Sequence, residues 1–170
     1  MIELAPFQQE DFNRLVNWID SEELLVTIAG NVWSYPLTSM QLQQYLDDPK
    51  SHSFNIIEVS TNVVIGHAEI ILGNDETCKI DKLLIDPAYR GKGLCPPVII
   101  NLLNYAFDNL PVHTVELNVF DWNMSGIRCY EKSGFSFNPE KKQQFALGDK
   151  TWTASNMSIT KDKYLSDVQK

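Results

Sequence analysis

A glycine-rich turn is the part of the chain whose residue types and spacing point most directly to chemistry. Arg90, Gly91, Lys92 and Gly93 lie between an apolar, strand-like run and a run with helical periodicity. Glycines let a backbone approach a ligand closely, and a helix start offers unpaired N–H groups and the positive end of a dipole. With two cations added, the stretch predicts an anion site suited to a phosphate group.

The two common nucleotide-binding motifs do not fit this turn. The P-loop pattern requires G-x-x-x-x-G-K-[ST], which the stretch lacks, and the dinucleotide pattern requires a third glycine where Pro96 stands. Two glycines before a helix are also compatible with an ordinary turn. The turn alone therefore leaves a phosphate site and a plain structural turn as open alternatives.

Two linked segments carry a family resemblance. Residues 90–95, RGKGLC, resemble the Q/R-x-x-G-x-G/A signature of the GCN5-related N-acetyltransferases (GNAT). Residues 123–135, NMSGIRCYEKSGF, look like their N-x-x-A-x-x-x-Y-E-K-x-G-F segment, and the spacing between the two is typical of the family. The chain is identified as a member of this superfamily, with likenesses to aminoglycoside 6′-N-acetyltransferases and to the acetyltransferases of ribosomal-protein N-termini.

The resemblance implies acetyl-coenzyme A (acetyl-CoA) as the cofactor. Backbone N–H groups of the turn would hold the pyrophosphate, and the strand before it would pair with the pantetheine arm like an added strand. Tyr130 would lie near the sulfur and act as the general acid for the departing thiolate. The implied cofactor-binding residues are Leu83, Leu84, Ile85, Arg90, Gly91, Lys92, Gly93, Leu94, Cys95, Asn123 and Tyr130.

Two residues depart from the family signature. Cys95 stands where the family has Gly or Ala, and its larger side chain would crowd the turn. Pro96 follows it and removes one backbone N–H from the anion site, although proline is tolerated in the first turn of a helix. We therefore expect the chain to bind the cofactor with lower affinity than is usual for the family.

Direct transfer of an acetyl group from a thioester to an amine requires a neutral amine, and Asp81 is the first candidate for the base. It stands in an otherwise apolar run, where an unpaired buried charge would be costly. A structural ion pair with Lys79, Lys82 or Arg128 is the alternative role for this carboxylate. Glu69 is the second candidate for the base.

Hydrophobic periodicity places these residues on a mixed sheet with helices on both faces, in the α/β (α+β) class. The order matches the GNAT fold, with six to seven mostly antiparallel strands and about four helices. We expect one domain over residues 1–160 and a polar, fraying tail over 161–170. Strands are predicted at 2–5, 54–59, 63–72, 79–85, 115–120, 135–137 and 151–159, and helices at 12–19, 38–48, 95–109 and 123–132.

Composition limits the classes of function. The net charge of −8 over 170 residues argues against a nucleic-acid partner. No apolar run approaches the length of a membrane span, and the first residues do not resemble a signal peptide. The three histidines lack ligand spacing with the cysteines, so no metal is expected. The three cysteines form no CxxC pair; we expect free thiols and a reducing, cytoplasmic compartment.

The acidity is uneven along the chain and bears on the acceptor. Residues 1–50 carry eight acidic and two basic side chains, whereas residues 79–95 carry four basic and two acidic ones. An acidic entrance would attract a cationic amine, such as a polyamine, an aminoglycoside or a protein N-terminus; solvated helix faces are the alternative. Trp33, Tyr35 and Tyr45 either wall the acceptor site or belong to the core.

A second class of function stays open beside the enzyme. The departures at Cys95 and Pro96 are compatible with a non-catalytic acyl-CoA-binding or assembly module, whereas Tyr130 and Asp81 favour the enzyme. Family members often form homodimers, so a homodimer is a further expectation from the resemblance.

Overall fold

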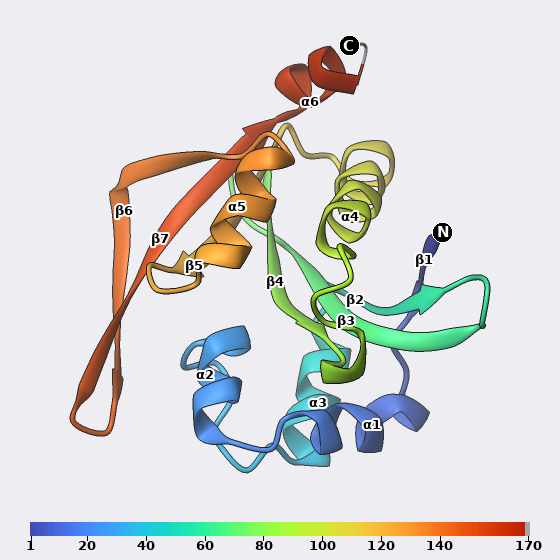
Figure 1. Ribbon diagram of the computed structural model, residues 1–170, viewed down its shortest axis with the longest axis vertical. Helices are drawn as coiled ribbons and strands as arrows, with labels where there is room; N and C mark the ends of the chain where they lie inside the picture. Colours follow the sequence, from blue (N-terminus) through green and yellow to red (C-terminus); the bar gives the residue numbers. More distant parts are fainter. Residues whose placement is uncertain (169–170) are drawn as a thin grey trace.

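The computed structural model describes residues 1–168, whose strands form a single seven-stranded sheet (Figure 1). The strands lie in the order β1-β2-β3-β4-β5-β7-β6, and all neighbours are antiparallel except the parallel pair β4 and β5. This arrangement confirms the predicted mixed, mostly antiparallel sheet. The strands are β1 (Ile2–Pro6), β2 (Ser51–Glu58), β3 (Val63–Leu72), β4 (Thr77–Ile85), β5 (Thr114–Phe120), β6 (Ser136–Leu147) and β7 (Lys150–Thr160).

Six α-helices lie within the described residues, two more than the sequence predicted. They are α1 (Phe12–Trp18), α2 (Glu22–Ala29), α3 (Ser39–Asp47), α4 (Cys95–Asn109), α5 (Met124–Lys132) and α6 (Lys161–Val168). Helices α2 and α6 were not predicted from the sequence. In α2, the side chain of Ser21 caps the helix by accepting a hydrogen bond from the Leu24 N–H at 3.1 Å.

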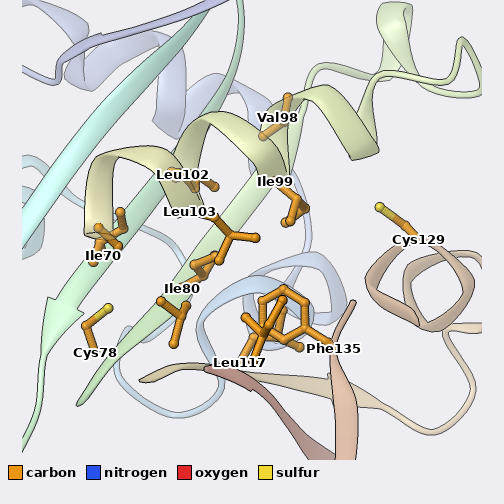
Figure 2. Close-up of a cluster of buried hydrophobic side chains, with 14 of the residues drawn as sticks. Ile70, Cys78, Ile80, Val98, Ile99, Leu102, Leu103, Leu117, Cys129 and Phe135 are labelled. Carbon is orange, nitrogen blue, oxygen red and sulfur yellow. The ribbon is translucent and has the colours of Figure 1, made fainter. Parts of the chain in front are cut away.

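Two apolar cores cover opposite faces of the sheet. Helix α4 packs its apolar stripe on one face, where Ile99, Leu102 and Leu103 are fully buried beside Ile80 and Leu117 (Figure 2). Helices α1, α2 and α3 form the second core on the other face. Strand β4 contributes to both cores, with Ile80 in the first and Leu84 in the second.

The parallel strands β4 and β5 diverge partway along their length. Their pairing ends at Ile80 opposite Leu117, although β4 continues to Ile85 and β5 to Phe120. Just beyond this point β4 carries one extra residue opposite β3, and Lys82 adopts a positive φ of 50°. The end of β4 therefore keeps backbone groups on its β5 side that no strand uses.

The expected fraying of residues 161–170 is wrong for the described part of this segment. Residues 161–168 form α6, in which Tyr164 is buried against Phe107 and donates a hydrogen bond from its hydroxyl to Asn104 Oδ1 at 2.5 Å. Residues 169 and 170, the remainder of the predicted tail, lie outside the described residues. None of the helices between residues 12 and 168 is both long and apolar enough to cross a bilayer.

The expectation of three free thiols is also wrong. A disulfide joins Cys95, at the start of α4, to Cys129 in α5, with a Cα–Cα distance of 6.3 Å. Only Cys78 is a free thiol in residues 1–168, and it is buried. The inference of a reducing compartment from free thiols therefore loses its basis.

Candidate active site

A cavity of about 470 Å³ opens where β4 and β5 diverge. Its walls bring together α2 and the loop after it, the ends of β4 and β5, helix α5 and the β6–β7 hairpin. The two sequence-predicted catalytic candidates, Asp81 and Tyr130, both line this cavity. The lining consists of residues 26–32, 79–83 and 117–120 with Asn123, Tyr130, Gln143, Phe145 and Ala154.

Tyr130 enters the cavity from α5. Burial raises the pKa of its phenol to about 12, so the hydroxyl keeps its proton throughout the physiological range. Its ring packs edge-on against Phe135, with the ring centroids 6.2 Å apart. No hydrogen bond from this hydroxyl to another group is found in residues 1–168. A protonated, unengaged phenol is suited to donate a proton or a hydrogen bond to a ligand in the cavity.

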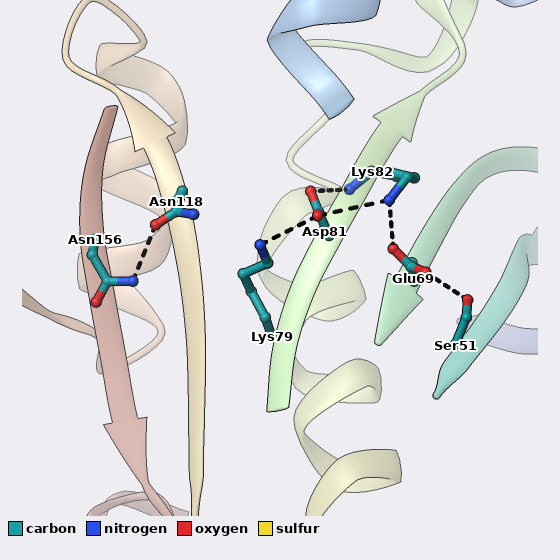
Figure 3. A network of polar contacts seen from close by, with 7 residues as sticks. All are labelled: Ser51, Glu69, Lys79, Asp81, Lys82, Asn118 and Asn156. Carbon is teal, nitrogen blue, oxygen red and sulfur yellow. Dashed lines mark hydrogen bonds and ion pairs between the residues drawn. The ribbon is translucent and has the colours of Figure 1, made fainter. Parts of the chain in front are cut away.

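Asp81 is partly exposed to the cavity and is also held by its neighbours. Its Oδ1 accepts a hydrogen bond from the Lys82 backbone N–H at 2.9 Å, and its Oδ2 lies 3.5 Å from Lys79 Nζ and 3.7 Å from Lys82 Nζ (Figure 3). The ion pairs expected as an alternative with these two lysines are thus present. They orient the carboxylate at the cavity wall.

Glu69, the second candidate for the base, is enclosed. Its Oε1 lies 2.7 Å from Lys82 Nζ, its Oε2 accepts a hydrogen bond from Ser51, and its side chain is only 2% exposed. It is not part of the cavity wall. Asp81 is therefore the better placed of the two carboxylates.

The glycine-rich turn follows β4 and leads into α4. Gly91 and Gly93 have φ values of 74° and 72°, in the left-handed region that favours glycine. A Cβ added to either would meet no atom within 4 Å, so their sides are open. Arg90 ties the turn to the strand by donating a hydrogen bond from Nε to the Ile85 carbonyl at 2.9 Å.

The start of α4 offers fewer anion donors than a typical helix start. Pro96 and also Pro97 lie in its first turn, and neither has a backbone N–H. The N–H groups of residues 91–95 are the ones available to an anion there. Pro97 thus removes a second donor, beyond the one whose loss was expected at Pro96.

Asn123 is engaged as the cap of α5. Its Oδ1 accepts a hydrogen bond from the Gly126 N–H at 3.1 Å, although the residue also lines the cavity. A Cβ at position 126 would lie 2.7 Å from Asn123 Nδ2, so alanine here would require the Asn123 side chain to shift. Contact between Asn123 and the cofactor stays a prediction.

Asn118 is a cavity residue that sequence reasoning missed. Asn156 donates a hydrogen bond to Asn118 at 3.0 Å (Figure 3). Asn138 in turn donates to Asn156 at 2.6 Å, so a chain of amides orients Asn118 from β6 through β7. Asn118 is exposed and lines the cavity. A polar amide inside the apolar strand VELNVF was the available signal.

Comparison with known proteins bears on the identity of this fold. Residues 12–135 match the model of the acetyltransferase (GNAT) family. The chain belongs to this family. The match covers β4, the glycine-rich turn and α5, which carry Asp81, the candidate anion site and Tyr130.

Curated GNAT relatives match part of the chain. A probable N-acetyltransferase, YjcK, of Bacillus subtilis is 32% identical over 98 residues, which cover 56% of this chain and 54% of the relative. The spermidine N(1)-acetyltransferase of Escherichia coli K12 is 30% identical over 86 residues, which cover 51% of this chain and 46% of the relative. The chain thus matches about half the length of these relatives. Neither relative is named for aminoglycosides or ribosomal proteins, so the finer likeness expected from the sequence is not supported.

A solved GNAT structure matches nearly the whole chain. The spermidine N-acetyltransferase of Vibrio cholerae, solved with CoA and spermine, has a TM-score of 0.83, covers 96% of this chain and 98% of its own, and is 20% identical. This likeness shows that the fold is the α+β GNAT fold. Another structure of that Vibrio cholerae enzyme is dodecameric.

Proposed function

We propose that this GNAT protein is an acetyl-CoA-dependent N-acetyltransferase whose acceptor is a polyamine such as spermidine. The observation that carries the proposal is that Tyr130 and Asp81, far apart in the sequence, meet in one cavity where β4 and β5 diverge. An acid and a base facing one cavity are what acyl transfer to an amine requires.

Acetyl-CoA fits the described residues in two places. The unpaired backbone at the end of β4, including Leu83 on the cavity wall, can bind an amide-rich arm as a strand would. The open turn with Gly91 and Gly93 can bind the phosphates through its N–H groups, with Lys92 adding positive charge. When bound, acetyl-CoA supplies the acetyl group as a thioester, whose sulfur leaves as a thiolate.

Two residues of the cavity, Tyr130 and Asp81, then each carry out one proton transfer. Tyr130 holds a proton that it can give to the leaving thiolate, because its raised pKa keeps the phenol neutral. Asp81 accepts a proton from the ammonium form of the acceptor, directly or through water, while Lys79 and Lys82 fix its orientation. No side chain needs to form a covalent bond with the acetyl group.

The proposal of a polyamine acceptor rests on the names of relatives and on the net charge of this chain. Two of the GNAT proteins compared above are named for spermidine. The net charge of −8 favours the approach of a polycation. The names of these relatives favour polyamines over the aminoglycosides and protein N-termini considered from the sequence, and assembly into oligomers is proposed from the Vibrio cholerae relative.

The test is a panel of amines with purified protein and acetyl-CoA. Free thiol is measured as it forms, and the acetylated product is identified by mass spectrometry. We expect spermidine and spermine to give the highest kcat/KM, with aminoglycosides and a peptide N-terminus lower. Tight CoA binding without acceptor-dependent thiol from any amine would instead indicate the non-catalytic module.

A further inference from the structure

The ammonium group of Lys82 is almost completely buried beside the candidate active site. Its side chain is 3% exposed, and its Nζ lies 2.7 Å from Glu69 Oε1 (Figure 3). The same Nζ lies 5.3 Å from the ring centre of Trp33 and 5.2 Å from that of Tyr45. We call the carboxylate of Glu69 and these two rings the ammonium cage.

The ammonium cage has the composition of a ligand site. A carboxylate with two aromatic faces is the combination with which proteins bind alkylammonium groups. Here the cation is tethered to the chain, because the extra residue in β4 and the positive φ of 50° at Lys82 direct its side chain toward Glu69. Lys82 also lines the cavity, so the cage lies directly behind the cavity wall.

The charges of this cluster are balanced. Lys82 and Lys79 are the cations, and Glu69 and Asp81 are the carboxylates that they contact. In the described part of the chain, this cluster thus has no carboxylate left over for a second ammonium group. An additional positive charge placed here would be repelled by Lys82 at short range.

We propose that Lys82 is a specificity-determining residue that fills an ammonium subsite and thereby excludes a second, nearby ammonium group of the acceptor. The inference rests on the proposed function, since it concerns the acceptor of that reaction. Short diamines are then poor acceptors, because both ammonium groups must lie close to Lys82. A long polyamine is accepted, because its remaining ammonium groups extend toward the mouth of the cavity.

Emptying the cage tests the proposal without catalysis. The K82A variant lacks the propylammonium part of the side chain, so n-propylammonium is the matching probe. At saturating probe, the melting temperature of K82A should rise by about 3 °C or more, whereas that of the wild type should not change. K82M, which fills the space without charge, and E69Q/K82A, which lacks the carboxylate, are controls that should not respond. Should K82A not fold, K82N serves as the open variant, because Asn adopts positive φ readily.

A specificity measurement then addresses the role in the reaction. The ratio of kcat/KM for 1,3-diaminopropane to that for n-propylamine should rise about tenfold in K82A, and by clearly less in K82M, which removes the positive charge but still fills the cage. The proposal is overturned if neither K82A nor K82N responds to n-propylammonium, or if K82M raises the ratio as much as K82A. Failure of the wild type to acetylate any amine would refute the proposed function, while the melting test would still decide whether the cage binds ammonium.

Discussion

The neutrality of Tyr130 is the property on which its proposed role as an acid depends. Replacement by phenylalanine keeps the ring that packs on Phe135 and removes only the hydroxyl. We expect Y130F to lower kcat about 100-fold, because a positioned general acid contributes roughly that factor or more. Y105F is the matched control, since the Tyr105 hydroxyl contacts His52 and is not part of the cavity wall.

The pH profile gives a further check on Tyr130 within the same prediction. Because its pKa is raised to about 12, the phenol remains protonated between pH 7 and 10. The wild-type kcat should therefore not fall on the alkaline side over this range. A fall with a midpoint near the ordinary tyrosine value, abolished in Y130F, would contradict the raised pKa.

The lowered pKa of His67 predicts that the folded protein loses stability in mild acid. Burial, and then the charges of Lys82 and Arg14, lower its pKa to about 3, and its Nε2 is 2.9 Å from the Tyr45 hydroxyl. The folded protein keeps this ring neutral, whereas the unfolded chain takes up a proton below about pH 6.5. Stability is thus highest above pH 6.5 and decreases as the pH falls toward 3, by about 2 kcal/mol at pH 5 from this group alone.

The variant H67Q isolates this effect, because glutamine can still hydrogen-bond to Tyr45 and does not titrate. Urea unfolding at pH 7.5 and pH 5 measures the loss for each protein. We expect the wild type to lose about 2 kcal/mol more than H67Q between the two pH values. Equal losses would show that His67 is accessible to protons in the folded state.

At the scale of elements, the disulfide joins the two helices that flank the proposed cofactor site. Cys95 begins α4 and Cys129 lies next to Tyr130 in α5, and the two cysteines are 34 positions apart in the sequence. A cross-link over such a segment stabilises the fold by about 3 kcal/mol. Reductant should therefore lower the melting temperature of the wild type by roughly 6 to 12 °C.

Two variants provide the controls for the disulfide. C78A, which removes the buried free thiol, should respond to reductant as the wild type does. The double variant C95A/C129A should melt at the lower temperature with or without reductant. A melting temperature that reductant does not change in the wild type would show that the two sulfurs are not bonded in solution.

Elements with strong periodic patterns were predictable from the sequence, and elements defined by tertiary pairing were not. The stripe that forms α4 and the apolar runs of β3 and β4 repeat at the spacing of their structures. Strand β6, in contrast, is mostly exposed and polar and includes Pro139, and only its pairing with β7 along the sheet edge defines it. Helix α2 has β-branched residues that weaken its helical signal.

The candidate site divides in the same way. The cavity residues Asp81 and Tyr130 were predicted, because one breaks an apolar pattern and the other belongs to a family segment. The disulfide and the ammonium cage were not, because each depends on side chains that only the packing of separate elements brings together. The turn glycines were also predicted, and both adopt the positive φ values that favour glycine.

At the scale of the whole molecule, the net charge acts on the approach of the acceptor, and local charges act on its binding. The net charge of −8 acts at a distance, whereas the residues around Asp81 form a balanced cluster. We expect kcat/KM for spermidine to fall several-fold between 50 and 500 mM salt, with kcat nearly unchanged. A monoamine such as n-butylamine, with a single charge, should show a weaker dependence. Equal salt dependence for both amines would place the acidic side chains outside the path of the acceptor.

The central claim is that one cavity holds both substrates while the acetyl group passes directly between them. Initial rates at several concentrations of acetyl-CoA and spermidine test this claim most directly. In a double-reciprocal plot, direct transfer in a ternary complex predicts a family of intersecting lines. Parallel lines would indicate a covalent acetyl-enzyme, and the absence of any spermidine-dependent rate would contradict the polyamine acceptor itself.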